Sequence, residues 1–110
     1  MMYVDFNAGM KEYKLRLNTR NIISLEKQLN CNPLMIFSDA ETMPTLTVMV
    51  SILHASLQQY QHGITMADAY NIFDEWLDDG HLMTDFLTVI VDIYRVSGLM
   101  SNVEVDGEKN

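Results

Sequence analysis

Carboxylates gather around Gly80, and they come nearest to a set of side chains whose types and spacing could do chemistry: Asp74, Glu75, Asp78, Asp79 and Asp85. Carboxylate oxygens suit Ca²⁺, and a glycine occupies the sixth position of an EF-hand loop. The spacing excludes such a loop, because Leu77 would take the third position and Phe86 the twelfth, and neither carries an oxygen ligand. We interpret these acids as a solvated helix end, although the helix dipole disfavours acids there.

The other groups capable of catalysis or metal binding are scattered. His54, His62 and His81 fall in three different predicted elements and in no Cys/His or H-E-x-x-H pattern. The serines lie in no nucleophile elbow, and the sequence has no glycine-rich phosphate loop. Cys31 is the single cysteine, which excludes an internal disulfide and a four-cysteine zinc site. We therefore expect no catalytic residue, no metal and no cofactor, and not an enzyme.

The formal net charge of the chain is −8, and its seven lysines and arginines are scattered. Binding to nucleic acid or to an anionic membrane needs clustered cations, so neither partner is expected. No apolar run approaches the roughly 18 residues of a membrane span. The N-terminus lacks the basic and apolar regions of a signal peptide, so we expect a cytoplasmic protein. An acidic balance favours solubility, or a partner that is basic or apolar.

The N-terminal segment alternates apolar and polar residues in two runs, over 3–7 and 11–17, and each run places its apolar side chains on one face. Asn7 and Gly9 between the runs tolerate a positive φ, so the pattern predicts a β-hairpin. A lone hairpin is marginal in water, and this one must lie on helices or pair with another chain.

Apolar periodicity and capping residues predict four helices, near 20–30, 44–61, 66–79 and 81–97. Asn18 or Thr19 caps the first, and Thr65 with Asp68 forms a capping pattern for the third. The fold class is therefore mainly α (α+β), a small N-terminal β-hairpin followed by a bundle of about four helices.

We expect a single domain over residues 1–99 and a disordered tail over 100–110, because the tail is polar and short of aromatic residues. Leu25, Leu53, Phe73 and Ile90 are expected in the core, since each lies on the apolar face of a predicted helix.

The helices predicted over 44–61 and 81–97 are apolar around most of their circumference. The first leaves one polar stripe, formed by Thr47, Ser51, His54, Gln58 and Gln61. A core-facing helix needs an apolar arc only somewhat above about 100°, so a second chain or a bound client should cover the surplus. We expect a homo-oligomer and a partner-binding surface, and the same residues could serve either use. The candidate contacts are Met49, Met83, Ile90, Val91 and Tyr94.

Several short segments carry a family resemblance through their order and spacing: YKLRL at 13–17, LEK at 25–27, NPL at 32–34, IF at 36–37, ILHA at 52–55, HGIT at 62–65 and VSGL at 96–99. Together they resemble the small tail assembly chaperones of long-tailed (siphovirus-type) phages and prophages of Gram-positive bacteria. The resemblance covers most of residues 11–99.

The resemblance implies a mostly helical, oligomerising protein without catalytic residues. Such a protein binds the tape-measure protein and keeps it soluble while the tail tube assembles around it, in the cytoplasm of the bacterial host. An alternative of another class stays open, an acidic decoy or regulatory protein that blocks a basic host or phage surface. Salt should weaken the binding of such a decoy steeply, because exposed charges are screened.

Overall fold

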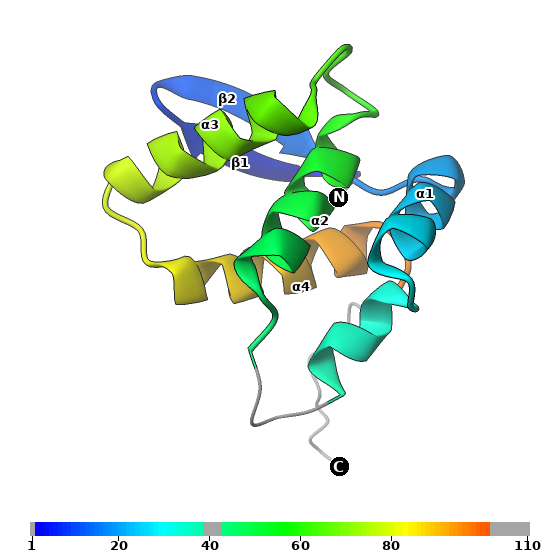
Figure 1. Cartoon of the computed structure of the whole chain (residues 1–110). Helices are drawn as coiled ribbons and strands as arrows, with labels where there is room; N and C mark the ends of the chain where they lie inside the picture. Colours follow the sequence, from blue (N-terminus) through cyan, green and yellow to red (C-terminus); the bar gives the residue numbers. More distant parts are fainter. Residues whose placement is uncertain (1, 39–42, 102–110) are drawn as a thin grey trace.

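The computed structural model describes residues 2–38 and 43–101, so most of the expected tail lies outside the described residues. It confirms the predicted fold class, with an N-terminal antiparallel hairpin followed by four α-helices in the described ranges (Figure 1). The elements in chain order are β1 (Val4–Ala8), β2 (Lys11–Leu15), α1 (Thr19–Leu29), the 3-10 helix η1 (Pro33–Phe37), α2 (Leu46–Leu57), α3 (Met66–Asp78), the 3-10 helix η2 (Met83–Asp85) and α4 (Phe86–Val96).

The hairpin closes through a two-residue turn at Gly9 and Met10. Both have positive φ, +57° and +68°, which is the geometry of the type I′ turn that matches the twist of paired strands. The register aligns Ala8 with Lys11 and Phe6 with Tyr13. The alternation therefore turns one face of the hairpin, including Phe6 and Ala8, into the core. The hairpin rests on helices of its own chain, which meets the requirement seen in the sequence.

The caps place α1 and α3 within a residue of their predicted ends. The side chain of Asn18 accepts a hydrogen bond from the Asn21 N–H at the start of α1. At the start of α3, Thr65 and Asp68 form a complete capping box. Asn30 ends α1 in the left-handed conformation, which asparagine tolerates better than most residues.

The other two helices are shorter than the ranges 44–61 and 81–97. The N-cap of α2 is Thr45, so Pro44 lies outside the helix, and α2 ends at Leu57. Beyond this end, the Gln58 side chain donates to the carbonyl oxygens of His54 and Ile64. In the fourth range, the Asp85 carboxylate accepts from the Leu82 N–H and forms a local turn, so regular α-helix begins only at Phe86.

The core surrounds α2, which touches α1, α3, α4 and β2. Eight of its twelve residues are buried, including Ser51 and Ser56. The four residues predicted to be core are confirmed as buried: Leu25, Leu53, Phe73 and Ile90. Most of the apolar surface that seemed surplus in the sequence is thus covered within the chain.

Candidate functional site

The five predicted contact residues do not form one surface. Met49, Ile90 and Tyr94 are fully buried, so in this conformation no partner can reach them. Val91 is half-buried, and Met83 is 38% exposed. The expectation for the three buried side chains is corrected by the packing of α2 and α4, whose apolar arcs face other elements of the same chain.

Tyr94 illustrates why these positions are structural. Its hydroxyl donates a 2.9 Å hydrogen bond to the Pro33 carbonyl oxygen, and its ring meets Phe37 edge to face. Burial raises the pKa of Tyr94 above its ordinary value, because the phenolate would lose its hydration. The residue thus joins α4 to η1 inside the protein.

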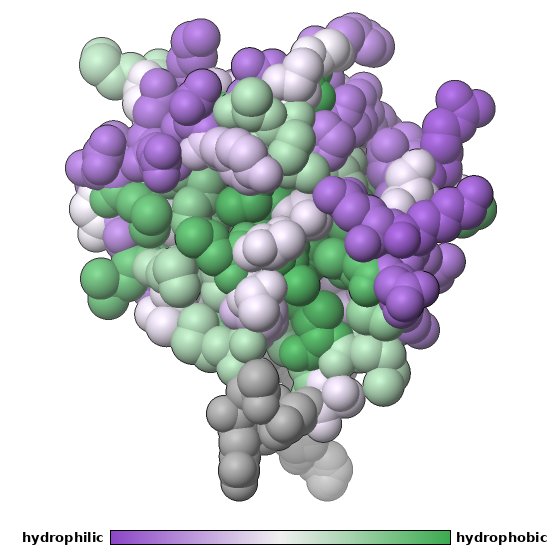
Figure 2. Space-filling view, in the orientation of Figure 1, coloured by the Kyte–Doolittle hydropathy of each residue, from purple (hydrophilic) through white to green (hydrophobic). Residues whose placement is uncertain are grey.

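An open groove between α2 and α3 is the best candidate for a binding site. Its volume is about 480 Å³, a size typical of pockets that bury a small ligand or a few side chains. Figure 2 shows apolar residues gathered over the lower middle of this face, with polar residues above them and along the outer side of α1. The lining is mainly apolar and comes from both helices: Leu46, Val50, Met66, Tyr70 and Phe73.

Two large side chains at this groove remain substantially exposed. Leu46, the first residue of α2, is 46% exposed, and Tyr70 in the middle of α3 is 56% exposed. They face the groove together with Phe73, which is buried and closes its base. Sequence reasoning missed the site, because the apolar periodicity of α3 does not distinguish a side chain in the core from one at the rim of a groove. A tyrosine can keep its polar end in water while its ring covers apolar surface.

The polar stripe predicted on α2 crosses this groove and is not fully solvated. Ser51 is buried, and its hydroxyl oxygen accepts a 3.2 Å hydrogen bond from the Gln28 side chain of α1. Thr47 lies one turn earlier and lines the same groove. The groove therefore offers an apolar wall on α3 and a narrow polar strip on α2.

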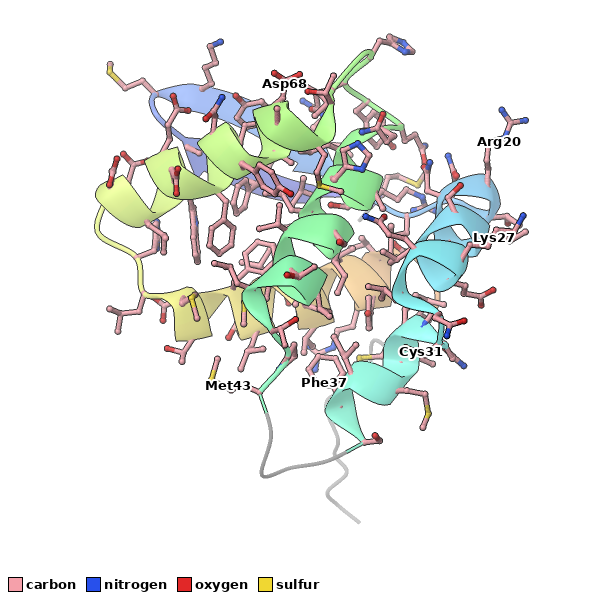
Figure 3. The ribbon with its side chains drawn as sticks, viewed as in Figure 1. Arg20, Lys27, Cys31, Phe37, Met43 and Asp68 are labelled. Carbon is pink, nitrogen blue, oxygen red and sulfur yellow. The ribbon has the colours of Figure 1, made fainter. Side chains whose placement is uncertain are left out.

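The charge at the groove is acidic. Among the described residues that line the groove, Asp74 is the one that carries a charge. Figure 3 shows Arg20 and Lys27 projecting from the outer side of α1, away from α2 and α3. Asp68 lies at the start of α3, where hydrogen bonds from Thr65 lower the pKa of its carboxyl group. A partner at the groove would thus meet apolar surface with negative charge beside it.

The described ranges, 2–38 and 43–101, contain no group of three or more His, Cys, Asp or Glu side chains placed to hold a metal ion. They also contain no helix that is long and apolar enough to cross a membrane. Cys31 is exposed and unpaired with another cysteine.

Comparisons with known proteins place the chain in a family without adding a function. No curated protein and no solved structure gives a significant match. The model of the family of unknown function DUF6096 matches residues 4–109, which is nearly the whole sequence. The chain therefore belongs to the family of unknown function DUF6096.

Proposed function

We propose that this protein is a phage tail assembly chaperone, which binds a helical segment of a tape-measure protein and keeps it soluble in the bacterial cytoplasm. The observation that carries the proposal is the open α2–α3 groove, with exposed Leu46 and Tyr70 at an otherwise closed core. The resemblance of residues 11–99 to such chaperones supplies the identity of the client.

The groove suits the apolar face of a helix better than a rigid small molecule. It is open, and its apolar lining comes from two packed helices, so residues spaced three or four apart on a client helix could enter it. The volume of about 480 Å³ accommodates a few side chains and not a whole helix. Asp74 at the margin favours a client with a lysine or arginine beside its apolar stripe.

Self-association belongs to the same proposal. Several large apolar side chains remain exposed away from the groove, including Met10, Met35 and Leu82. A homo-oligomer would cover part of this surface, and stable interfaces bury more than about 1,000 Å². Light scattering at tens of micromolar protein measures this directly, and a strict monomer would contradict it.

The test of function is co-expression with the tape-measure protein of the same phage. The client should stay soluble, co-purify with this chain and remain bound in about 0.5 M salt, because apolar burial is not screened as exposed charge is. Leu46→Asp should release the client. The variant should remain folded, since an acid in the first turn of α2 interacts favourably with the helix dipole.

The matched control is Ile23→Asp on α1. Ile23 is 47% exposed, close to the 46% of Leu46, and it does not line the groove. It should leave the client bound. Equal release by both variants would mean that the groove is not the client site, and a client that is equally soluble alone would remove the chaperone function.

The second candidate is an acidic protein that covers a basic surface of the host or phage. The net charge of −8 favours it. Its complex should dissociate at modest salt and should tolerate Leu46→Asp, because the binding would rest on exposed charge. The same salt series therefore separates the two candidates.

A further inference from the structure

The two edges of the hairpin differ in whether their outward-pointing backbone N–H and C=O groups form hydrogen bonds. In a two-residue hairpin the pair that closes the turn, here Ala8 and Lys11, exchanges hydrogen bonds, and pairs alternate from there. Phe6 and Val4 therefore bond inward to β2. The N–H and C=O groups of Asp5 and Asn7 on β1 point away from the hairpin, as do those of Glu12 and Lys14 on β2.

The edge of β2 is largely occupied by its own chain. The Gln61 side chain donates to the Lys14 carbonyl oxygen at 2.9 Å and accepts from the Lys14 N–H at 2.8 Å. This amide thus reproduces both bonds of a neighbouring strand residue. The Arg16 N–H, just beyond the strand, donates to the Ser56 carbonyl oxygen of α2. As far as the described residues show, Glu12 alone keeps open outward groups on β2, and a single residue is too short for strand pairing.

The edge of β1 is open. Within the described residues, no hydrogen bond satisfies the outward backbone groups of Asp5 or Asn7. A hollow of about 440 Å³ runs beside them and reaches α4 and the end of α3. In Figure 1, β1 is the strand nearer to α4. The hollow therefore lies where a third strand would continue the sheet.

The chemistry of the hollow indicates its occupant. Asp5 and Asp85 bring two carboxylates, and no lysine or arginine of the described residues lines the hollow. Phe6, Trp76 and Val89 supply an apolar wall, with His81 stacked on the Trp76 ring at 4.4 Å between centroids. A strand presents alternate side chains to opposite faces, so basic residues alternating with apolar ones match this surface.

We propose that the open edge of β1 binds an extended segment of a partner protein, with alternating basic and apolar residues, as an added strand of the sheet. Its backbone would pair with Asp5 and Asn7, its basic side chains would lie on the exposed face beside the Asp5 carboxylate, and its apolar side chains would lie on the face of Phe6 and Trp76. This site is separate from the α2–α3 groove and does not depend on the proposed client.

Charge argues against a second copy of this chain as the occupant. Antiparallel pairing of β1 with β1 of a second copy would bring Asp5 and Asp85 toward the same two residues of that copy. Each of the two molecules also carries a net charge of −8. Like charges across paired strands are destabilising, and inward or edge charges commonly prevent such pairing. A basic segment gains from the same charges.

The test uses the full chain and the acetylated, amidated peptide (Lys-Val)4. We expect binding, and the amide protons of Asp5 and Asn7 should exchange about tenfold more slowly in the complex because the added strand bonds their N–H groups. Asp5→Lys should weaken the binding about tenfold or more through charge repulsion. The control Glu26→Lys makes the same charge change on exposed α1 and should weaken it far less.

A peptide of the same sequence with every backbone nitrogen methylated retains its charge and loses its donors. It should bind weakly and leave the Asp5 and Asn7 amides unprotected. Equal binding of the methylated peptide, or equal loss in Asp5→Lys and Glu26→Lys, would overturn the proposal in favour of diffuse charge attraction. Protection of these two amides that grows with protein concentration and needs no peptide would overturn it in favour of a second copy.

Discussion

The two ends of α4 are held in place by different kinds of contact. At its start, Phe86 is fully buried among three other rings, with centroid distances of 5.2 Å to Phe73, 5.6 Å to Trp76 and 6.0 Å to Phe6. We call these four residues the ring cluster. A long-range hydrogen bond near this cluster joins the hairpin turn to the end of α3, from the Gly9 N–H to the Asp79 carboxylate.

At the other end of α4, directional hydrogen bonds dominate. Tyr94 donates to the Pro33 carbonyl oxygen, and Arg16 donates to the Val96 carbonyl oxygen at 2.8 Å. The Ser97 hydroxyl oxygen accepts from the Leu17 N–H at 2.9 Å. These bonds join residues 61 to 80 positions apart. Ring packing depends little on direction, so we infer that the ring cluster supplies most of the energy and the hydrogen-bonded end fixes the geometry.

The largest effect should come from the ring cluster. Phe86→Ala should lower the free energy of unfolding by about 3–5 kcal/mol, because it removes buried ring surface and leaves a cavity. Urea denaturation measures the change. Phe37, which is half-buried, provides the control, and Phe37→Ala should cost clearly less. Equal losses at both positions would show that the ring cluster has no special share of the stability.

Much of this core was predictable from the sequence. The helical periodicity identified Leu25, Leu53, Phe73 and Ile90 as core because an apolar face must be buried somewhere. The caps located α1 and α3 because an N-cap side chain bonds to backbone only a few residues away. Both signals are local, so neither depends on the arrangement of the other elements.

The hydrogen-bonded end should respond less strongly and with a distinct pH dependence. Tyr94→Phe keeps the ring and its contact with Phe37 but removes the hydroxyl that donates to the Pro33 carbonyl oxygen. We expect a loss of about 1–3 kcal/mol. Tyr60→Phe is the control, since Tyr60 contacts the Tyr3 ring and makes no hydroxyl hydrogen bond in the described residues. If Tyr94→Phe lost no more stability than Tyr60→Phe, the hydrogen bonds at this end of α4 would not contribute as proposed.

The pH dependence follows from the raised pKa of Tyr94. In the unfolded chain the hydroxyl ionises near the ordinary pKa of 10.0, whereas burial keeps it protonated in the fold. The unfolded state then binds fewer protons, so stability is intact below that pH and falls as pH rises through and above it. Between about pH 9 and about pH 11 the native chain should lose more stability than Tyr94→Phe. Identical slopes would mean that Tyr94 ionises as readily in the fold.

The candidate sites were less predictable than the core. An apolar side chain has the same sequence signature whether its own chain or a partner covers it, so Met49, Ile90 and Tyr94 were assigned to a contact surface. Which edge of the hairpin stays open depends on Gln61. Its side chain bonds to Lys14 and so covers the edge of β2, while the edge of β1 is left open. Such pairings join distant residues with short polar side chains, and no local pattern specifies them.

The smallest effect should come from the hydrogen bond beside the ring cluster. Asp79 stands where the helix dipole disfavours an acid, and its bond to the Gly9 N–H gives a reason for the placement. Asp78→Ala is a close control, because this acid is also exposed at the end of α3 and bonds to no distant residue in the described structure. Removing Asp78 should stabilise the fold slightly, by about 0.3–1 kcal/mol, through relief of the dipole.

Asp79→Ala should gain the same relief and lose the hydrogen bond, so it should be less stable than Asp78→Ala by about 0.5–1.5 kcal/mol. The difference between the two variants in urea denaturation isolates the bond to the hairpin turn. It should remain smaller than the loss in Tyr94→Phe, since the exposed Gly9 N–H can bond to water in the variant, whereas the bond to the Pro33 carbonyl oxygen is buried. A larger difference would show that the region around the ring cluster also relies on directional bonding, and the contrast with the hydrogen-bonded end of α4 would fail.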